Sequence, residues 1–200
     1  MSIGSDISYL AIPLGYLLGS FPSAYVIGRL TGHIDMRTEG DGRISAAAVY
    51  RKIGIIPYLL VVASDIGKGV LSILLANLIS NSLPIMLVTG FVTMVGHCWS
   101  VFLKFRGGLG ATVICGVLIS VPPITIPLII AMLIGGIVAL ITHKSGLATG
   151  IILVLASIIL LIQNILYKQP PLFVAPFPII LALLMVFKRL QVNRSNKVTS

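Results

Sequence analysis

Long runs of apolar residues constrain the fold of this 200-residue chain more than any other feature. Hydrocarbon offers no partner to an exposed peptide group, so a segment that crosses a bilayer must be a helix of about 20 mostly apolar residues. Seven candidate spans follow one another, at about 7–30, 53–79, 84–103, 111–121, 127–142, 147–167 and 172–187. The fourth and fifth are short and bounded by prolines, and merging them would reduce the total to six or five. We expect an all-α integral membrane protein, a seven-transmembrane-helix bundle that forms a single domain over residues 1–200.

Composition and charge fit this fold class and orient it. Only 10% of the residues are charged and the mean hydropathy is +1.09, whereas soluble domains carry about 25% charged residues. The net charge of +9 would suggest nucleic acid in a soluble domain, but here most cations fall between spans on one side. The positive-inside rule makes that side cytoplasmic, with the N-terminus outside and the C-terminus inside. The N-terminus lacks the basic region of a cleavable signal, so the first span should stay as an anchor.

A polar stretch between the third and fourth spans, residues 96–112, carries the clearest chemical signal. Glycines accept positive φ and let the backbone approach a ligand, and amides that lead into a helix can cradle an anion. Nearby cations would bind a phosphate, arginine as a bidentate fork. Alternatively, the glycines could serve close helix packing, and the histidine could be a core residue whose hydrogen bonds are satisfied. The candidates are His97, Lys104, Arg106, Gly107, Gly108 and Gly110.

Two further polar features complete the candidate set. When the seven spans cross the membrane alternately, the loop at 31–52, with Arg37, Asp41 and Arg51, lies on the same cytoplasmic face as 104–110. Asp65 and Lys68 lie within the second span, three residues apart and so on one helix face. Either they form a structural ion pair or they bind substrate. The two cysteines have no metal-ligand spacing and imply no disulfide framework.

Four motifs, in order between residues 15 and 112, are similar to those of a known family. The stretch at 96–112 resembles the Gly-His-x-x-Pro-Val-Phe-Leu-x-Phe-Lys-Gly-Gly-Lys-Gly motif of the bacterial acyl-phosphate:glycerol-3-phosphate acyltransferases (PlsY-type). Residues 18–25 look like that family's Gly-Ser-Ile-Pro-x-x-Tyr segment. Residues 35–51 are similar to its Asp-Ile-Arg-x-x-Gly-Ser-Gly-Asn-Ile-Gly-Ala-Thr-Asn-Val-x-Arg motif, and residues 65–69 match its Asp-x-x-Lys-Gly.

The resemblance implies an enzyme of phospholipid biosynthesis in the bacterial inner (cell) membrane. Such an enzyme moves a fatty acyl group from acyl phosphate to the 1-hydroxyl of glycerol 3-phosphate and gives lysophosphatidic acid. It needs no metal or other cofactor, and an acyl-phosphate-forming enzyme is a possible partner beside the membrane lipids. The resemblance gives catalytic roles to His97, Arg106 and Asp41. It gives substrate or phosphate binding to Arg37, Arg51, Lys104, Gly107, Gly108, Gly110, Asp65 and Lys68.

Several motif positions differ from the family pattern. Asp41 stands at the motif serine, and Leu109 replaces a lysine that would contact phosphate. The other changes are Arg43 for asparagine, Ala47 for threonine, Ala48 for asparagine and Ser100 for proline. A non-catalytic paralogue that binds lipid precursors or partners the active enzyme is therefore a second hypothesis, and a small transporter a third. In these the motifs would persist without acyl transfer.

Overall fold

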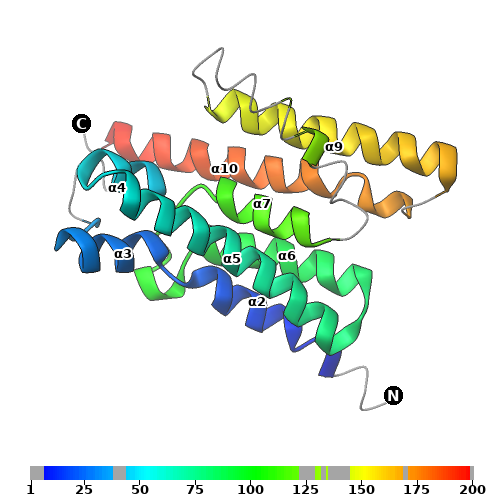
Figure 1. Cartoon of the computed structure of the whole chain (residues 1–200), viewed down its shortest axis with the longest axis horizontal. Coiled ribbons are helices and arrows are strands. Elements are labelled where there is room, and N and C mark those ends of the chain that lie inside the picture. Colours follow the sequence, from blue (N-terminus) through cyan, green and yellow to red (C-terminus); the bar gives the residue numbers. More distant parts are fainter. Residues whose placement is uncertain are drawn as a thin grey trace. The chain divides into compact units, whose positions relative to one another are not determined.

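The computed structural model describes residues 7–37, 44–121, 129–131, 134, 145–168 and 171–198. All regular secondary structure in these ranges is helical, and Figure 1 shows the elements along the chain. The chain divides into two compact units. The first unit joins Met1–Val117 with Lys188–Ser200, and the second comprises Leu118–Phe187. Every candidate site residue belongs to the first unit.

The first expected span is a broken helix. Helix α2 covers Ala11–Ser20 and α3 covers Ser23–Gly32, and together they reach 22 residues with a mean hydropathy of 1.2. Pro22 has no N–H and its ring crowds the preceding turn, so the α-helical ladder stops before it. The break leaves the Phe21 carbonyl outside that ladder, pointing at the neighbouring helix α5.

Helices α5 (Ile55–Ser80) and α6 (Leu83–Cys98) pack against α2 in the first unit. Glycines bring the backbones of α2 and α6 into direct contact. A Cβ at Gly19 would overlap the backbone of Thr93, and one at Gly96 would overlap the Tyr16 carbonyl. Such close approach maximises van der Waals contact where the hydrophobic effect cannot drive association. A short 3₁₀ turn, η1 (Val101–Leu103), continues the third span.

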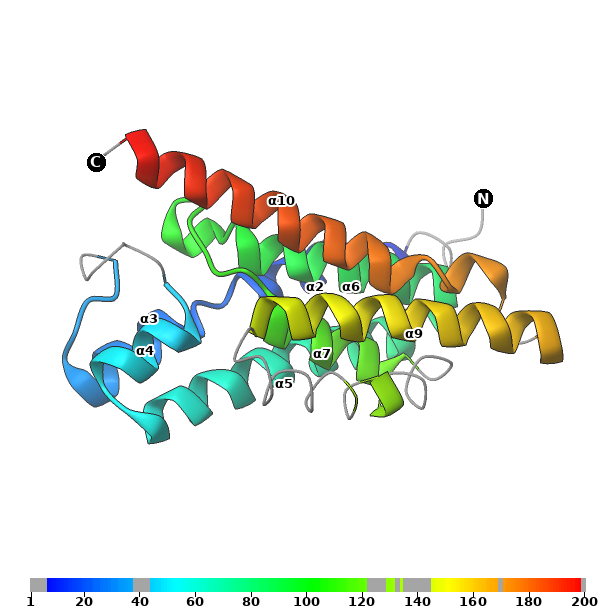
Figure 2. The same ribbon diagram turned by 90° about the horizontal axis from the view of Figure 1, so that it is seen from above.

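Both candidate loops lie at one end of the first unit. Helix α4 (Ala46–Lys52) begins after Ser45, whose hydroxyl accepts a hydrogen bond from the Ala48 amide at 3.3 Å. Helices α3 and α4 both pack on α5 and lie at the same end of the unit as the loop that follows η1 (Figure 2). Met36, Ile44 and Leu103 join the buried cluster that holds this end together.

The fourth expected span is the short helix α7 (Ala111–Ser120). It starts directly after the glycine-rich loop and approaches α5 through paired glycines. A Cβ at Gly69 would lie 2.7 Å from the Val113 carbonyl oxygen, and one at Gly116 would overlap the Ile66 carbonyl. This contact fixes the start of α7 beside Asp65.

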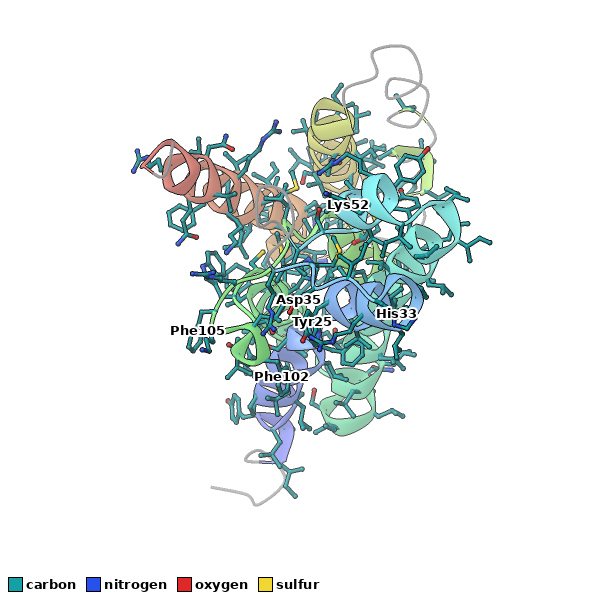
Figure 3. All side chains as sticks on the ribbon, turned by 90° about the vertical axis from the view of Figure 1, so that its left-hand side faces the viewer. Tyr25, His33, Asp35, Lys52, Phe102 and Phe105 are labelled. Carbon is teal, nitrogen blue, oxygen red and sulfur yellow. The ribbon has the colours of Figure 1, made fainter. Side chains whose placement is uncertain are left out.

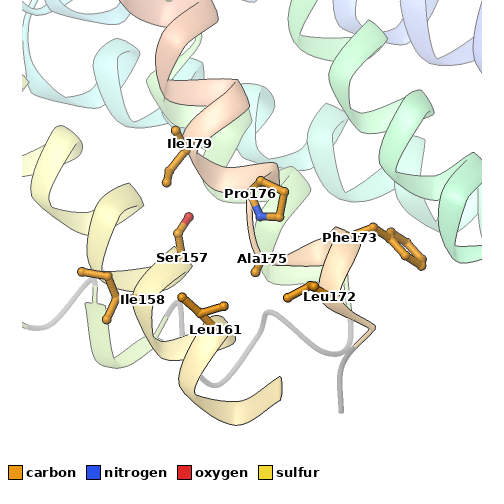
Figure 4. Close-up of a pocket in the computed structure, with 8 residues that line it drawn as sticks. All are labelled: Ser157, Ile158, Leu161, Leu172, Phe173, Ala175, Pro176 and Ile179. Carbon is orange, nitrogen blue, oxygen red and sulfur yellow. The ribbon is translucent and has the colours of Figure 1, made fainter. Parts of the chain in front are cut away.

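The second unit contains α9 (Ser145–Tyr167), η2 (Leu172–Val174) and the beginning of α10 (Phe177–Val198). Side chains of these three elements line an apolar groove of about 690 Å³. Figure 4 shows the groove with the hydroxyl of Ser157 among aliphatic and aromatic groups. None of the candidate residues lies in this groove.

Five helices of the described chain are long and apolar enough to cross a membrane. They are Ala11–Gly32, Ile55–Ser80, Leu83–Leu103, Thr149–Tyr167 and Leu172–Arg194. Helix α7 is shorter, and the fifth expected span, 127–142, lies almost wholly outside the described residues. The protein is therefore an all-α, multi-pass membrane protein, while the total of seven spans stays a prediction.

Candidate functional site

A buried polar network ties α5 to α6. The Lys68 ammonium lies 2.9 Å from Oδ1 of Asp65 and 2.8 Å from Nδ1 of His97. The side chains of Asp65 and Lys68 are each 5% exposed, so neither charge can be solvated and each must be neutralised by the other. The structure thus brings His97 to the Asp65–Lys68 pair, which the sequence analysis named separately from it.

Two hydroxyl groups, which the sequence analysis did not single out, complete the coordination of the carboxylate. Ser23 of α3 donates a hydrogen bond to Oδ1 of Asp65, and Thr112 of α7 donates to Oδ2 at 3.1 Å. Lys68 also donates to the Phe21 carbonyl at 3.1 Å. The signal for this set was Pro22, because a proline within a span predicts a helix break and an exposed carbonyl. The network therefore joins four helices at one point.

The glycine-rich loop lies directly on His97. A Cβ at Gly107 would overlap the carbonyl of His97, and one at Gly108 would overlap its ring nitrogen Nε2. His97, Lys68 and both glycines line a cavity of about 20 Å³, room for about one water-sized atom. Gly110 has a φ of +85°, and a Cβ there would meet Met94 and Cys98 instead. Its role is to turn the chain into α7.

Next to this cavity lies an open basic hollow of about 370 Å³, lined by Arg37, Ile44, Phe102, Leu103, Lys104 and Arg106. Ile44 and Leu103 line both the hollow and the small cavity, so the two spaces adjoin. The hollow unites residues of the 31–52 loop with residues of the 104–110 loop. Its size suits a small substrate, and its three cations suit an anion. We call it the basic hollow.

Arg37, which lines the basic hollow, forms an ion pair with Asp35. Its Nη2 lies 2.7 Å from Oδ2 of Asp35, and its guanidinium stacks 4.7 Å above the centre of the Tyr25 ring. These hydrogen bonds from Arg37 hold the pKa of Asp35 at about 2, below its usual 3.8. Figure 3 looks onto this end, where Tyr25 and Asp35 appear between Phe102 and Phe105 on one side and His33 on the other.

The remaining candidates are Lys104, which lines the basic hollow, and Arg51 and Asp41. Lys104 and Phe105 both have positive φ, 53° and 61°, and this backbone turn leaves both side chains exposed. Arg51 is exposed on α4 and does not line the basic hollow. Asp41 lies outside the described residues. Within the described ranges, no three His, Cys, Asp or Glu side chains gather as a metal site would require.

The end of the C-terminal helix packs against Trp99, two residues after His97. The Lys188 ammonium lies 4.6 Å above the centre of the Trp99 ring, and Trp99 Nε1 donates to Oε1 of Gln191 at 3.2 Å. Lys188 is buried. The sequence analysis read the tail only as basic, and this aromatic partner could not be seen from spacing. The contact attaches the tail to the end of α6.

These features define a class: a helical multi-pass membrane protein with an anion-binding hollow next to a buried ionic network. The sequence model of the glycerol-3-phosphate acyltransferase family matches residues 9–197. The chain belongs to the glycerol-3-phosphate acyltransferase family, and the resemblance seen in the four motifs is confirmed.

Individual relatives agree with this family. "Glycerol-3-phosphate acyltransferase 2" of Moorella thermoacetica is 38% identical over 117 residues, 58% of this chain and 60% of the relative. The matched segment thus spans less than two thirds of that relative's length. "Glycerol-3-phosphate acyltransferase" of Rubrobacter xylanophilus is 34% identical over 156 residues, 78% of this chain and 76% of the relative.

Solved structures of PlsY, described as an integral membrane glycerol 3-phosphate acyltransferase, have the same fold. The glycerol 3-phosphate form matches with a TM-score of 0.77 and 27% identity, over 94% of this chain and 90% of that one. The lysophosphatidic acid form matches with a TM-score of 0.71 over the same shares. The similarity extends across both units of the chain.

Proposed function

We propose that this protein is an acyltransferase that moves a fatty acyl group from acyl phosphate to the 1-hydroxyl of glycerol 3-phosphate, giving lysophosphatidic acid for phospholipid biosynthesis. One observation carries the proposal beyond family membership. Arg37, Lys104 and Arg106, which belong to two separate loops, line one basic hollow. Both substrates bear phosphate, and charge-assisted hydrogen bonds from such cations are the strong way to hold it.

The site residues divide by position. In the basic hollow, Arg37, Lys104 and Arg106 bind phosphate, with Arg106 also close to the reacting group. The hydroxyl oxygen forms the new ester bond while the bond from acyl carbon to phosphate oxygen breaks. Inorganic phosphate leaves and takes up the hydroxyl proton. The carbonyl oxygen becomes anionic during this step and needs donors in place. The amides of Gly107 and Gly108 and the ring of His97 supply such donors.

The other assigned residues complete the proposal. Gly110 shapes the loop, Asp65 and Lys68 support His97, and Arg51 and Asp41 serve the substrate from the 31–52 loop. Asp41 would repel a phosphate unless a cation such as Arg43 pairs with it. Replacing Asp41 by serine together with Leu109→Lys should therefore raise the rate of acyl transfer. An unchanged rate would mean that these two positions do not limit the site.

The proposed topology has seven spans in the bacterial inner membrane, with the N-terminus outside, the C-terminus cytoplasmic and one functional domain over residues 1–200. The basic hollow supports it, because Arg37 and Lys104 can share a hollow only if both loops lie on one side. The partners are acyl phosphate, glycerol 3-phosphate, membrane lipids and an upstream acyl-phosphate-forming enzyme. No cofactor is required. Labelling of cysteines introduced in each loop with a membrane-impermeant reagent tests the orientation.

The activity is tested by giving purified protein radiolabelled glycerol 3-phosphate and palmitoyl phosphate. We expect lysophosphatidic acid from the wild type and none from Arg106→Ala. Arg194→Ala is the matched control, because it removes an exposed arginine of the C-terminal helix that does not line the basic hollow. Folded wild-type protein that binds the substrates without making product would instead support the non-catalytic paralogue. Unchanged turnover in Arg106→Ala would remove the phosphate role of that residue.

A further inference from the structure

The contact between Lys68 and His97 restricts where the imidazole can carry its proton. An ammonium group has three N–H donors and no lone pair, so it cannot accept a hydrogen bond. Lys68 Nζ lies 2.8 Å from Nδ1 of His97. If Lys68 is charged, Nδ1 must therefore be the acceptor and carry no proton, and the proton of a neutral ring resides on Nε2.

The geometry around Asp65 indicates which of the two bases carries the charge. Oδ1 of Asp65 lies 2.9 Å from Lys68 Nζ but 3.8 Å from His97 Nδ1. The carboxylate is thus hydrogen-bonded to the ammonium and not to the ring. Four acceptors surround the three N–H donors of Lys68: Asp65, Nδ1 of His97, the Phe21 carbonyl and, at 3.3 Å, the Ser23 hydroxyl. This set fully satisfies a charged lysine.

The opposite edge of the ring faces the small cavity. Nε2 of His97 lies against Gly108, where a side chain would overlap it. Among the described residues no hydrogen bond involves Nε2, and the buried hydroxyl of Ser20, another residue that lines this cavity, also has no partner. The cavity is thus lined by groups that can donate to an oxygen atom, and it has room for about one such atom.

We propose that Lys68, held in place by Asp65, is a positioning residue that fixes His97 as the neutral tautomer with its proton on Nε2. The ring then presents a hydrogen-bond donor, and no basic nitrogen, to a phosphate or carbonyl oxygen that enters from the basic hollow. Lys68 also lines this cavity, but its N–H donors are directed at protein acceptors. This inference rests on the proposed function for its kinetic consequences, while the tautomer can be measured without turnover.

The spectroscopic test uses protein with ¹⁵N-labelled histidine, in which His33→Asn and His143→Gln leave His97 as the one histidine. Asparagine suits position 33 because His33 has a φ of 53°. Correlation spectra at neutral pH should show Nε2 bonded to hydrogen and Nδ1 not. The variant Asp65→Leu with Lys68→Met removes both charges together, so that neither is left buried alone. In that variant the two tautomers should become mixed.

A kinetic test separates positioning from substrate binding. In the Asp65→Leu, Lys68→Met variant, kcat should fall at least about tenfold while KM for glycerol 3-phosphate changes less than about threefold, since only transition-state stabilisation is lost. The control Ser72→Ala removes a hydroxyl one turn away on α5 that bonds only the Gly69 carbonyl in the described chain. Its kcat, KM and tautomer should match those of the wild type.

Several outcomes would overturn the inference. A proton on Nδ1, or on both ring nitrogens, in the wild type would show that His97 and not Lys68 holds the charge. An unchanged Nε2 tautomer in the double variant would show that Lys68 does not fix it. A large rise in KM with kcat preserved would make Lys68 a substrate ligand. Wild-type protein that makes no product would refute the proposed function, yet the spectra would still decide the tautomer.

Discussion

Two acid–base pairs in the first unit have similar geometry and opposite surroundings. Asp35 and Arg37 approach to 2.7 Å with side chains 23% and 49% exposed, while Asp65 and Lys68 approach to 2.9 Å with both 5% exposed. Water and salt screen the first pair, so a bound phosphate can compete with Asp35 for Arg37. The second pair has no such solvent and cannot open without leaving a bare charge. The exposed pair is thus suited to exchanging partners with a ligand, and the buried pair is suited to holding the His97 ring in place.

The largest expected effect comes from breaking the buried pair on one side. Asp65→Leu leaves the Lys68 ammonium uncompensated and should lower the free energy of unfolding by roughly 3–5 kcal/mol. Adding Lys68→Met should recover much of that loss, since apolar residues of similar volume replace the pair. Denaturant titration of the detergent-solubilised protein measures both. Equal losses in the single and double variants would mean that burial does not distinguish the two pairs.

A methyl group added to the glycine loop should disturb the ring that the buried pair holds. In Gly108→Ala the new Cβ meets Nε2 of His97, so the ring or the loop must move, and kcat should fall by roughly tenfold to a hundredfold. Gly67→Ala is the control, because nothing lies within 4 Å of a Cβ there. Alanine inside α5 should leave kcat unchanged and stabilise the helix by up to about 1 kcal/mol. Equal kcat values for the two variants would mean that the loop does not affect catalysis through the His97 ring.

Removing the exposed cation should weaken substrate binding without halting turnover. Arg37→Ala deletes a charge-assisted hydrogen bond, so KM for glycerol 3-phosphate should rise about tenfold. Asp35→Asn, which keeps Arg37, should leave KM equal or lower it. Rising ionic strength should increase the wild-type KM, because the basic hollow is open to salt. A salt-independent KM would show that these cations are not the ones that bind substrate.

The smallest effect concerns the titration of Asp35. Its pKa of about 2 lies below the 3.8 of an unpaired aspartate, so the pair's contribution is complete above pH 3.8 and vanishes as pH falls through 2. Stability at neutral pH should therefore not depend on pH through Asp35. The side-chain ¹³C shift of Asp35 should titrate near 2 in the wild type and closer to 3.8 in Arg37→Ala. Identical midpoints would mean that Arg37 does not set this pKa.

The membrane fold and much of the site follow from the sequence, because both are patterns of residue type. Hydropathy predicts the helices that carry the site, and a glycine-rich basic stretch between two spans predicts where an anion would bind. The same reasoning groups Arg37 with Lys104, since loop charges fix the side of the membrane. It cannot give the rotation of α5 against α6, which brings Lys68 to His97. That rotation depends on packing between residues 29 positions apart.

The placement of other residues could not be predicted from the sequence, for local reasons. Arg51 shares the charge and loop of Arg37, but α4 turns it outward, and nothing in composition indicates the face of a seven-residue helix. Ser23 and Thr112 resemble many other hydroxyls in membrane helices until the break at Pro22 and the start of α7 place them on Asp65. The final contacts of a site thus depend on where helices begin and end.

The glycine seam between α2 and α6 has a mechanical consequence. The backbones of the two helices are in contact at Gly19 and Gly96. Because neither helix can slide or rotate without a steric collision, this pair forms the rigid part of the first unit. When a bulky lipid precursor binds, the segments attached to this pair must therefore move, chiefly residues 101–110. Amide hydrogen exchange should accordingly be slowest along the seam and fastest in that loop, with substrate slowing the loop alone.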